Sequence, residues 1–162
     1  MRNPRRFLLF SIAVAAISLG PPNLSAAPTT AKAPEACSLI TDADAQQITG
    51  VPMRRQPVKY PFNCSYDPVT PVPGPKTAVY LNVFNYGDRE ETFWQTTKKA
   101  IPGNPQPLHE MGDEAFYVRS SKTDAAIYVR KGSSHFILTC GGANPDLFER
   151  MKTVVKKIVG KL

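Results

Sequence analysis

Cysteine is the first residue type in this chain that could do chemistry. Cys140 lies in the string TCGG, at the end of a predicted strand and just before a helix with a clear start signal. Backbone dipoles could stabilise an unpaired thiolate there, with His135 or His109 as its base. However, His135 is five residues before Cys140, so regular strand alternation puts the two side chains on opposite faces. We therefore expect a buried or disulfide-bonded Cys140, and keep a nucleophile as the alternative.

A second chemical signal is the acidic string HEMGDE. It contains His109, Glu110, Asp113 and Glu114, all metal-ligand types, and His135 could in principle join them. A metal needs convergent geometry, and the string lacks the two-histidine helical spacing of a zinc protease. Sequence adjacency of two carboxylates also does not indicate the separation that glycoside hydrolysis needs. We expect a turn before a strand, with no metal and no cofactor.

Aromatic residues are the ones best able to form a binding surface. They could line a groove on the predicted sheet and hold a peptide or small apolar ligand through ring contacts and hydroxyl hydrogen bonds. The candidate ligand-binding residues are Tyr80, Phe84, Tyr86, Tyr117 and Tyr128, with Phe116 beside them. The alternative is that most of these rings belong to the core. Binding requires that two proline-rich loops leave one sheet face open.

The cysteines also bear on how the chain is held together. Cys37, Cys64 and Cys140 allow three single-bridge pairings, and an oxidising compartment would favour one of them. We expect Cys37 to pair with Cys64, because both precede most of the predicted sheet. Closing that loop would contribute about 3 kcal/mol of stability.

Hydrophobic periodicity predicts five strands and three helices that position these residues. The predicted strands are 62–66, 77–86, 115–119, 125–130 and 134–140. The predicted helices lie between Thr41 and Gly50, between Asp88 and Pro102, and from Asn144 towards Leu162. Strand 77–86 is apolar on both faces, so we expect it to be central and covered on both sides. Short turns predict an antiparallel meander of the last three strands, and the whole is a single α+β domain.

The first 27 residues have the pattern of an export signal. Arg2, Arg5 and Arg6 form a basic head, and the apolar run 7–19 is shorter than the roughly 20 residues that a membrane-spanning helix needs. We therefore expect a signal peptide over 1–27, a flexible segment over 28–36 and the folded domain over 37–162. No transmembrane segment is expected after processing, and no lipid anchor, because Cys37 is preceded by a poor lipobox.

Composition argues against wholesale disorder, collagen-like repetition and a dense disulfide scaffold. The chain has 162 residues, of which 42% are hydrophobic, which is enough for a packed core. Its formal charge of +7 falls to +4 without the three leader arginines, so charge alone does not indicate nucleic-acid binding.

The final predicted helix places its lysines largely opposite its apolar stripe: Lys152, Lys156, Lys157 and Lys161. We interpret them as a solvated face, with binding to an anionic surface as the alternative.

Three short strings resemble an uncharacterised family of bacterial secreted domains, many of whose members are lipoproteins of unknown function. They are ACSLITDADAQQITG at 36–50, NCSY at 63–66 and GDEAFY at 112–117. The resemblance covers about residues 37–162 and implies a cell-envelope α+β domain, similar to a PsbP-like sandwich. It implies no catalytic residue. The missing lipobox puts membrane anchoring in doubt for this chain.

These observations together predict a noncatalytic, exported cell-envelope domain that binds a partner. The expected location is periplasmic or secreted, and the expected partner is an envelope protein, a peptide or a small apolar ligand. Two other functions stay open: a thiol- or metal-dependent periplasmic enzyme, and a module that binds anionic surfaces through its basic helix.

Overall fold

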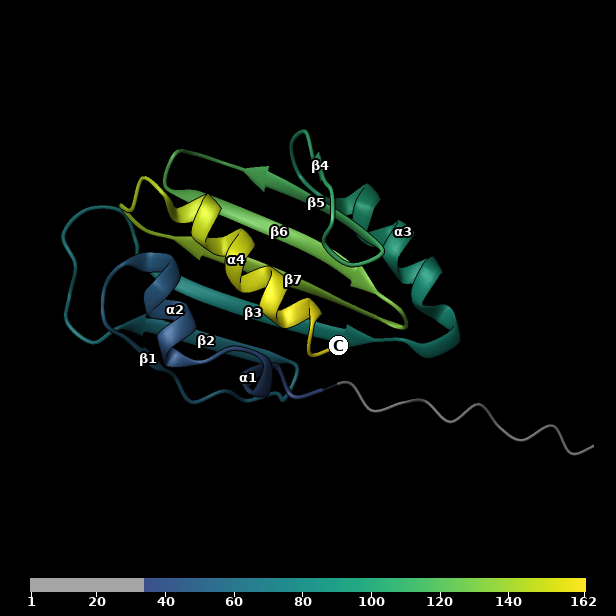
Figure 1. The fold of residues 1–162 in the computed structure, drawn as a ribbon, viewed down its shortest axis with the longest axis horizontal. Helices are drawn as coiled ribbons and strands as arrows, with labels where there is room; N and C mark the ends of the chain where they lie inside the picture. Colours follow the sequence, from purple (N-terminus) through teal and green to yellow (C-terminus); the bar gives the residue numbers. More distant parts are fainter. Residues whose placement is uncertain (1–33) are drawn as a thin grey trace, which may run out of the picture.

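The strands form one antiparallel sheet of seven strands in the order β1-β2-β3-β7-β6-β5-β4 (Figure 1). This computed structural model describes residues 34–162, so the predicted signal peptide and most of the flexible segment lie outside the described residues. The strands are β1 Met53–Arg55, β2 Asn63–Pro68, β3 Ala78–Asn85, β4 Gln106–Leu108, β5 Glu114–Arg119, β6 Asp124–Lys131 and β7 Ser134–Gly141. The helices are α1 Ala36–Leu39, α2 Asp42–Thr49, α3 Glu90–Ala100 and α4 Leu147–Val159, with a 3-10 turn η1 at Gly87–Arg89.

The α+β class and the antiparallel sheet are confirmed, but the predicted five strands and three helices are too few. The missed strands β1 and β4 have three residues each and form the two edges of the sheet. The missed helix α1 has four residues. Segments this short do not complete a hydrophobic period, so periodicity does not reveal them. Strand β4 also contains Pro107, which is tolerated because an edge strand needs fewer backbone donors.

Helices α1, α2 and α4 lie across one face of the sheet and enclose the main core (Figure 1). Helix α2 begins with a capping box in which Thr41 and Asp44 each bond the other's backbone amide, and it ends at Gly50 in the left-handed conformation. The predicted stripe of α4 is buried at Leu147, Met151, Val154, Val155 and Ile158. Alternate residues of the central strands meet this stripe, so local periodicity accounts for the core.

Helix α3 packs on the other face of the sheet, but only at one end. It covers a row of residues that lie side by side on four neighbouring strands. They are Phe84 of β3, His135 of β7, Arg130 of β6 and Glu114 of β5. Trp94 of α3 is fully buried there. Further along β3, Tyr80 lies on the same face and stays exposed. The expectation that strand 77–86 is covered on both sides therefore holds at its α3 end only.

A disulfide between Cys37 and Cys64 joins α1 to β2, which confirms the predicted pairing. Cys64 is buried and belongs to the main core, so the bridge ties the first helix to the interior of the sheet. Within residues 34–162, no helix is both long enough and apolar enough to span a bilayer.

Candidate functional site

Aromatic rings collect where β3 leaves the open part of the sheet and approaches α3. We define the aromatic surface as Tyr60, Phe62, Tyr80, Phe84 and Tyr86. Tyr60 and Phe62 come from the loop between β1 and β2, and the other three come from β3 or the residue after it. Tyr60, Phe62 and Tyr80 are 47%, 38% and 36% exposed. Large apolar groups with this exposure, gathered in one place, are typical of a binding surface.

Four of these five rings, all except Tyr80, form a continuous ladder of ring contacts. Ring centroids of Tyr60 and Phe62 lie 5.2 Å apart with a 12° interplanar angle, and Phe62 lies 6.0 Å from Phe84. Phe84 then lies 6.2 Å from Tyr86, which stacks at 3.8 Å on Phe93 of α3. The ladder therefore connects the exposed loop to the helix that covers the sheet, and each ring limits the rotation of the next.

Two cavities open beside this ladder. One has a volume of about 290 Å³ and is lined by Tyr60, Asn63, Ser65, Tyr80 and Asn82, among others. The other, of about 310 Å³, is lined by Phe62, Val83, Phe84, Asn85 and Tyr86. Each is close to the lower size limit of small-ligand sites. Together they provide apolar walls with a few polar groups.

The polar groups of the first cavity have unused hydrogen-bonding capacity. The Asn63 side-chain amide donates to Asn82 Oδ1 at 2.6 Å, while Asn63 Oδ1 is buried with no partner. A buried acceptor without a donor costs roughly 1–3 kcal/mol. Two lysines lie over the tyrosine rings, with Lys59 Nζ 5.2 Å from the Tyr60 centroid and Lys76 Nζ 5.8 Å from that of Tyr80.

A buried hydrogen bond between a histidine and a glutamate supports the ladder from beneath. His135 Nδ1 of β7 lies 2.5 Å from Glu90 Oε1 at the start of α3, and both residues are buried. The second oxygen of Glu90 accepts a hydrogen bond from the Tyr86 amide at 3.3 Å. The His135 ring lies 4.9 Å from that of Phe84. The pair thus holds the α3 end of the aromatic surface to the centre of the sheet.

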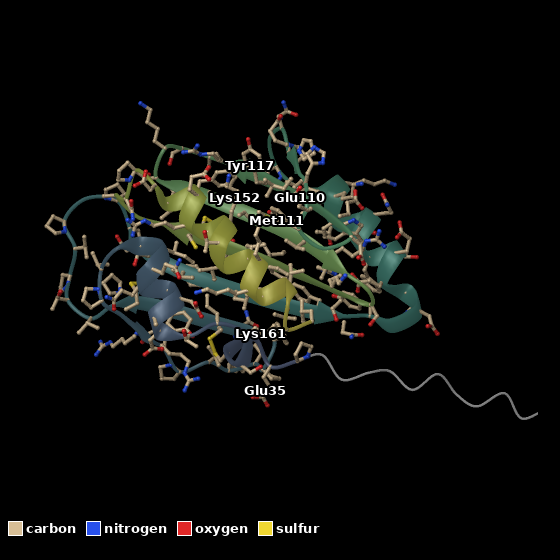
Figure 2. All side chains as sticks on the ribbon, viewed as in Figure 1. Glu35, Glu110, Met111, Tyr117, Lys152 and Lys161 are labelled. Carbon is tan, nitrogen blue, oxygen red and sulfur yellow. A yellow bond between two sulfur atoms is a disulfide. The ribbon has the colours of Figure 1, made fainter. Side chains whose placement is uncertain are left out.

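The structure divides the five predicted ligand-binding residues into three groups. Tyr80, Phe84 and Tyr86 belong to the aromatic surface. Tyr128 lies on the same face of the sheet, packed on Phe116 at 5.3 Å, and burial raises its pKa. Tyr117 is on the opposite face, the one α4 covers, and packs 4.5 Å from Phe148 (Figure 2). It therefore does not join the others.

Tyr60 and Phe62 are the residues that the sequence reasoning missed. In the predicted strand 62–66, alternation would place Phe62 on one face with Cys64 and Tyr66, but Phe62 precedes β2 and is exposed, whereas the other two are buried. The available signal was the density of apolar rings in the string KYPF, next to a proline that disfavours a regular strand. This segment has no period of its own, so periodicity could not place it.

The chemical candidates lie apart from one another. Cys140 is buried in the main core, and burial raises the pKa of its thiol, which disfavours the reactive thiolate. The residue pairing of β7 is regular, so His135 lies on the other face of the sheet from Cys140. His109 is exposed in the loop between β4 and β5.

The acidic residues of the HEMGDE string have structural partners. Asp113 accepts from the Gly132 amide at 2.7 Å and pairs with Lys131. Glu114 accepts from Trp94 Nε1 at 2.5 Å and pairs with Lys98. Within residues 34–162, no three His, Cys, Asp or Glu side chains gather as a metal site would require.

Two lysines of α4, and Lys161 just after it, contact the protein itself. Lys152 pairs with Glu149, Lys157 with Asp44, and Lys161 donates to the Leu39 carbonyl at 2.8 Å. These contacts tie α4 to itself, α2 and α1. They reduce the positive charge that the helix can offer an anionic surface.

No protein family model, curated protein sequence or solved structure matches this chain.

Proposed function

We propose that this protein is a noncatalytic, exported domain that binds its ligand on the aromatic surface. The observation that carries the proposal is the ring ladder from Tyr60 to Tyr86, which is exposed at Tyr60 and Phe62 and has two cavities beside it. Burying exposed apolar surface stabilises a complex by about 25 cal/mol per Å². Rings are suited to this role because they offer large contact areas and lose little conformational freedom.

Binding is favoured over catalysis by the types of residue at the surface. Rings, carboxamides and lysines line it, and these groups position a ligand. A nucleophile paired with a base is the usual sign of covalent catalysis. The cysteine that the sequence suggested for this role, Cys140, is instead enclosed in the main core.

The exported location is part of the same proposal. The Cys37–Cys64 disulfide supports it, because disulfides form and persist in oxidising compartments. The basic and apolar pattern of residues 1–27 supports it independently. A periplasmic or extracellular domain would meet its ligand there.

The anionic apolar dye ANS tests the binding surface directly, because its fluorescence rises on exposed apolar surface. We expect the folded protein to enhance ANS fluorescence, and a Tyr60→Ser/Phe62→Ser variant to lose most of the signal. Val69→Ser is the matched control, since Val69 is 49% exposed but lies outside the aromatic surface. Circular dichroism would verify that each variant is folded. Equal fluorescence from all three proteins would contradict the proposal.

A further inference from the structure

The aromatic surface lies on a sheet face, so it must recognise a ligand through side chains. Strand β2 lies between β1 and β3, and strand β3 lies between β2 and β7, so each is already paired on both sides. Even Phe62, just before β2, uses its carbonyl to accept from the Val83 amide at 2.8 Å. A peptide therefore cannot add as another strand here, which is the usual way that sheets bind extended chains.

The charged side chains at the surface add only hydrogen-bond donors, whereas its hydroxyls can both donate and accept. Lys59 and Lys76 are donors only, and the hydroxyls of Tyr60 and Tyr80 can donate. The one buried acceptor left unpaired is Asn63 Oδ1 within the described residues. An ordinary extended peptide would bring one backbone N–H per residue, and any N–H that faced a lysine or a ring would lack an acceptor. A ligand rich in carbonyls and poor in N–H groups fits better.

Polyproline II is the peptide conformation with this property. Proline has no N–H, and the polyproline II helix makes no internal hydrogen bonds, so its carbonyls are free to accept. Its proline rings pack on aromatic side chains, as in the aromatic-lined grooves that bind proline-rich segments. Tyr80 and Phe84 are four residues apart on β3, which is about 13 Å at the strand rise. About four residues of polyproline II, at about 3.1 Å each, would span that distance.

Charge further restricts the ligand. No Asp or Glu lines either cavity. Lys59 and Lys76 form no ion pair within the described part of the chain. At the α3 end of the ladder, the Arg89 guanidinium lies over the Phe93 ring. Positive groups therefore flank the rings at both ends. An acidic ligand complements this arrangement.

The geometry points to an extended, proline-rich, acidic peptide segment as the ligand of the aromatic surface. This inference rests on the proposed function and names the ligand class. The prolines would pack on the rings, the carbonyls would accept from the tyrosine hydroxyls, and the acidic side chains would lie beside Lys59 and Lys76.

The test uses fluorescein-labelled peptides and fluorescence anisotropy with the folded protein. The probe is a capped peptide of repeating Glu-Pro-Pro units. One comparison peptide replaces each proline by alanine, and the other replaces each glutamate by lysine. We expect the Glu-Pro-Pro peptide to bind at least about tenfold more tightly than either comparison, and more weakly as salt rises. Tyr60→Ala and Lys59→Gln should each weaken it by about fivefold or more, while Val69→Ala should not.

Several outcomes would overturn the inference. Equal affinity for the alanine peptide would remove the role of proline, and preference for the lysine peptide would remove the role of charge. If ANS binding depends on Tyr60 and Phe62 but no peptide binds, the ligand class is wrong and the binding surface stands. If neither probe binds, both proposals fail. Self-association that Phe62→Ala abolishes would identify a second copy as the occupant instead.

Discussion

His135 of β7 and Glu90 of α3 form a buried pair, with Nδ1 and Oε1 2.5 Å apart, that joins the helix to the middle of the sheet. The two residues are 45 positions apart in the sequence. Because Glu90 also accepts from the Tyr86 amide, one carboxylate fixes both the start of α3 and the end of the aromatic surface. The position of α3 therefore affects both stability and the candidate site.

Removing Glu90 should destabilise the fold strongly. Glu90→Ala leaves the buried His135 Nδ1 without its hydrogen-bond partner, and a buried polar group left unsatisfied in this way costs about 1–3 kcal/mol. The neighbouring Glu91 pairs with Arg130 but is 60% exposed, so Glu91→Ala is a matched control with an expected cost of about 0–1 kcal/mol. Urea unfolding followed by circular dichroism measures both. Similar losses in the two variants would show that the buried pair has no special role.

Stability should fall at acidic pH, in part through Glu114. Burial alone would raise the pKa of Glu114, but hydrogen bonds from Lys98 and Trp94 outweigh it and lower the pKa below its ordinary value of 4.5. The folded state then binds fewer protons than the unfolded state as the pH falls below 4.5. This contribution is present above that pH and is lost as the pH falls through the folded-state pKa.

The urea midpoint measured from neutral to acidic pH would reveal this dependence. Glu114→Gln should flatten the decline, and Lys98→Met should do so partly, because it removes one of the groups that lower the pKa of Glu114. Asp113 contributes in the same direction, since a hydrogen bond from the Gly132 amide lowers its pKa. Some decline should therefore remain in both variants. An unchanged slope in Glu114→Gln would contradict the assignment.

Local signals in the sequence were sufficient for the elements that carry their own start, stop and period. The capping pair Thr41 and Asp44 with Gly50 predicted α2, and the apolar stripe predicted α4. The short turns between β5, β6 and β7 predicted their antiparallel pairing. In each case the determining residues are close together in the chain, so no tertiary contact is needed to identify the element.

Features set by distant contacts were not predictable in the same way. The Glu90–His135 pair needs α3 to fold onto β7, and the position of Tyr60 depends on a loop without a period. One error was avoidable. Phe116 and Tyr117 are consecutive in a strand, so alternation requires that they lie on opposite faces, and only one of them can line a given groove. Edge strands β1 and β4 were missed because three residues do not establish alternation.

The disulfide should contribute measurably to stability. Cys37 and Cys64 are separated by 27 positions, and opening a loop of this length costs about 3 kcal/mol. A Cys37→Ala/Cys64→Ala variant should therefore unfold at a clearly lower urea concentration than the oxidised protein. Reduced wild-type protein is the matched comparison and should approach the variant. A midpoint that changes in neither case would mean that the bridge adds no constraint to the unfolded chain.

The state of Cys140 separates the binding and thiol interpretations. Its thiol is buried in the main core, and burial raises its pKa, so the thiolate is scarce at neutral pH and out of reach. We expect iodoacetamide to leave the native, oxidised protein unmodified, and to add one group after unfolding without reductant. Reduction before unfolding and alkylation should give three groups, one for each cysteine. Intact mass spectrometry with peptide mapping reads all three states. Stoichiometric labelling of Cys140 in the native protein would instead restore a thiol-dependent activity as a leading interpretation, because only an accessible thiolate can act as a nucleophile.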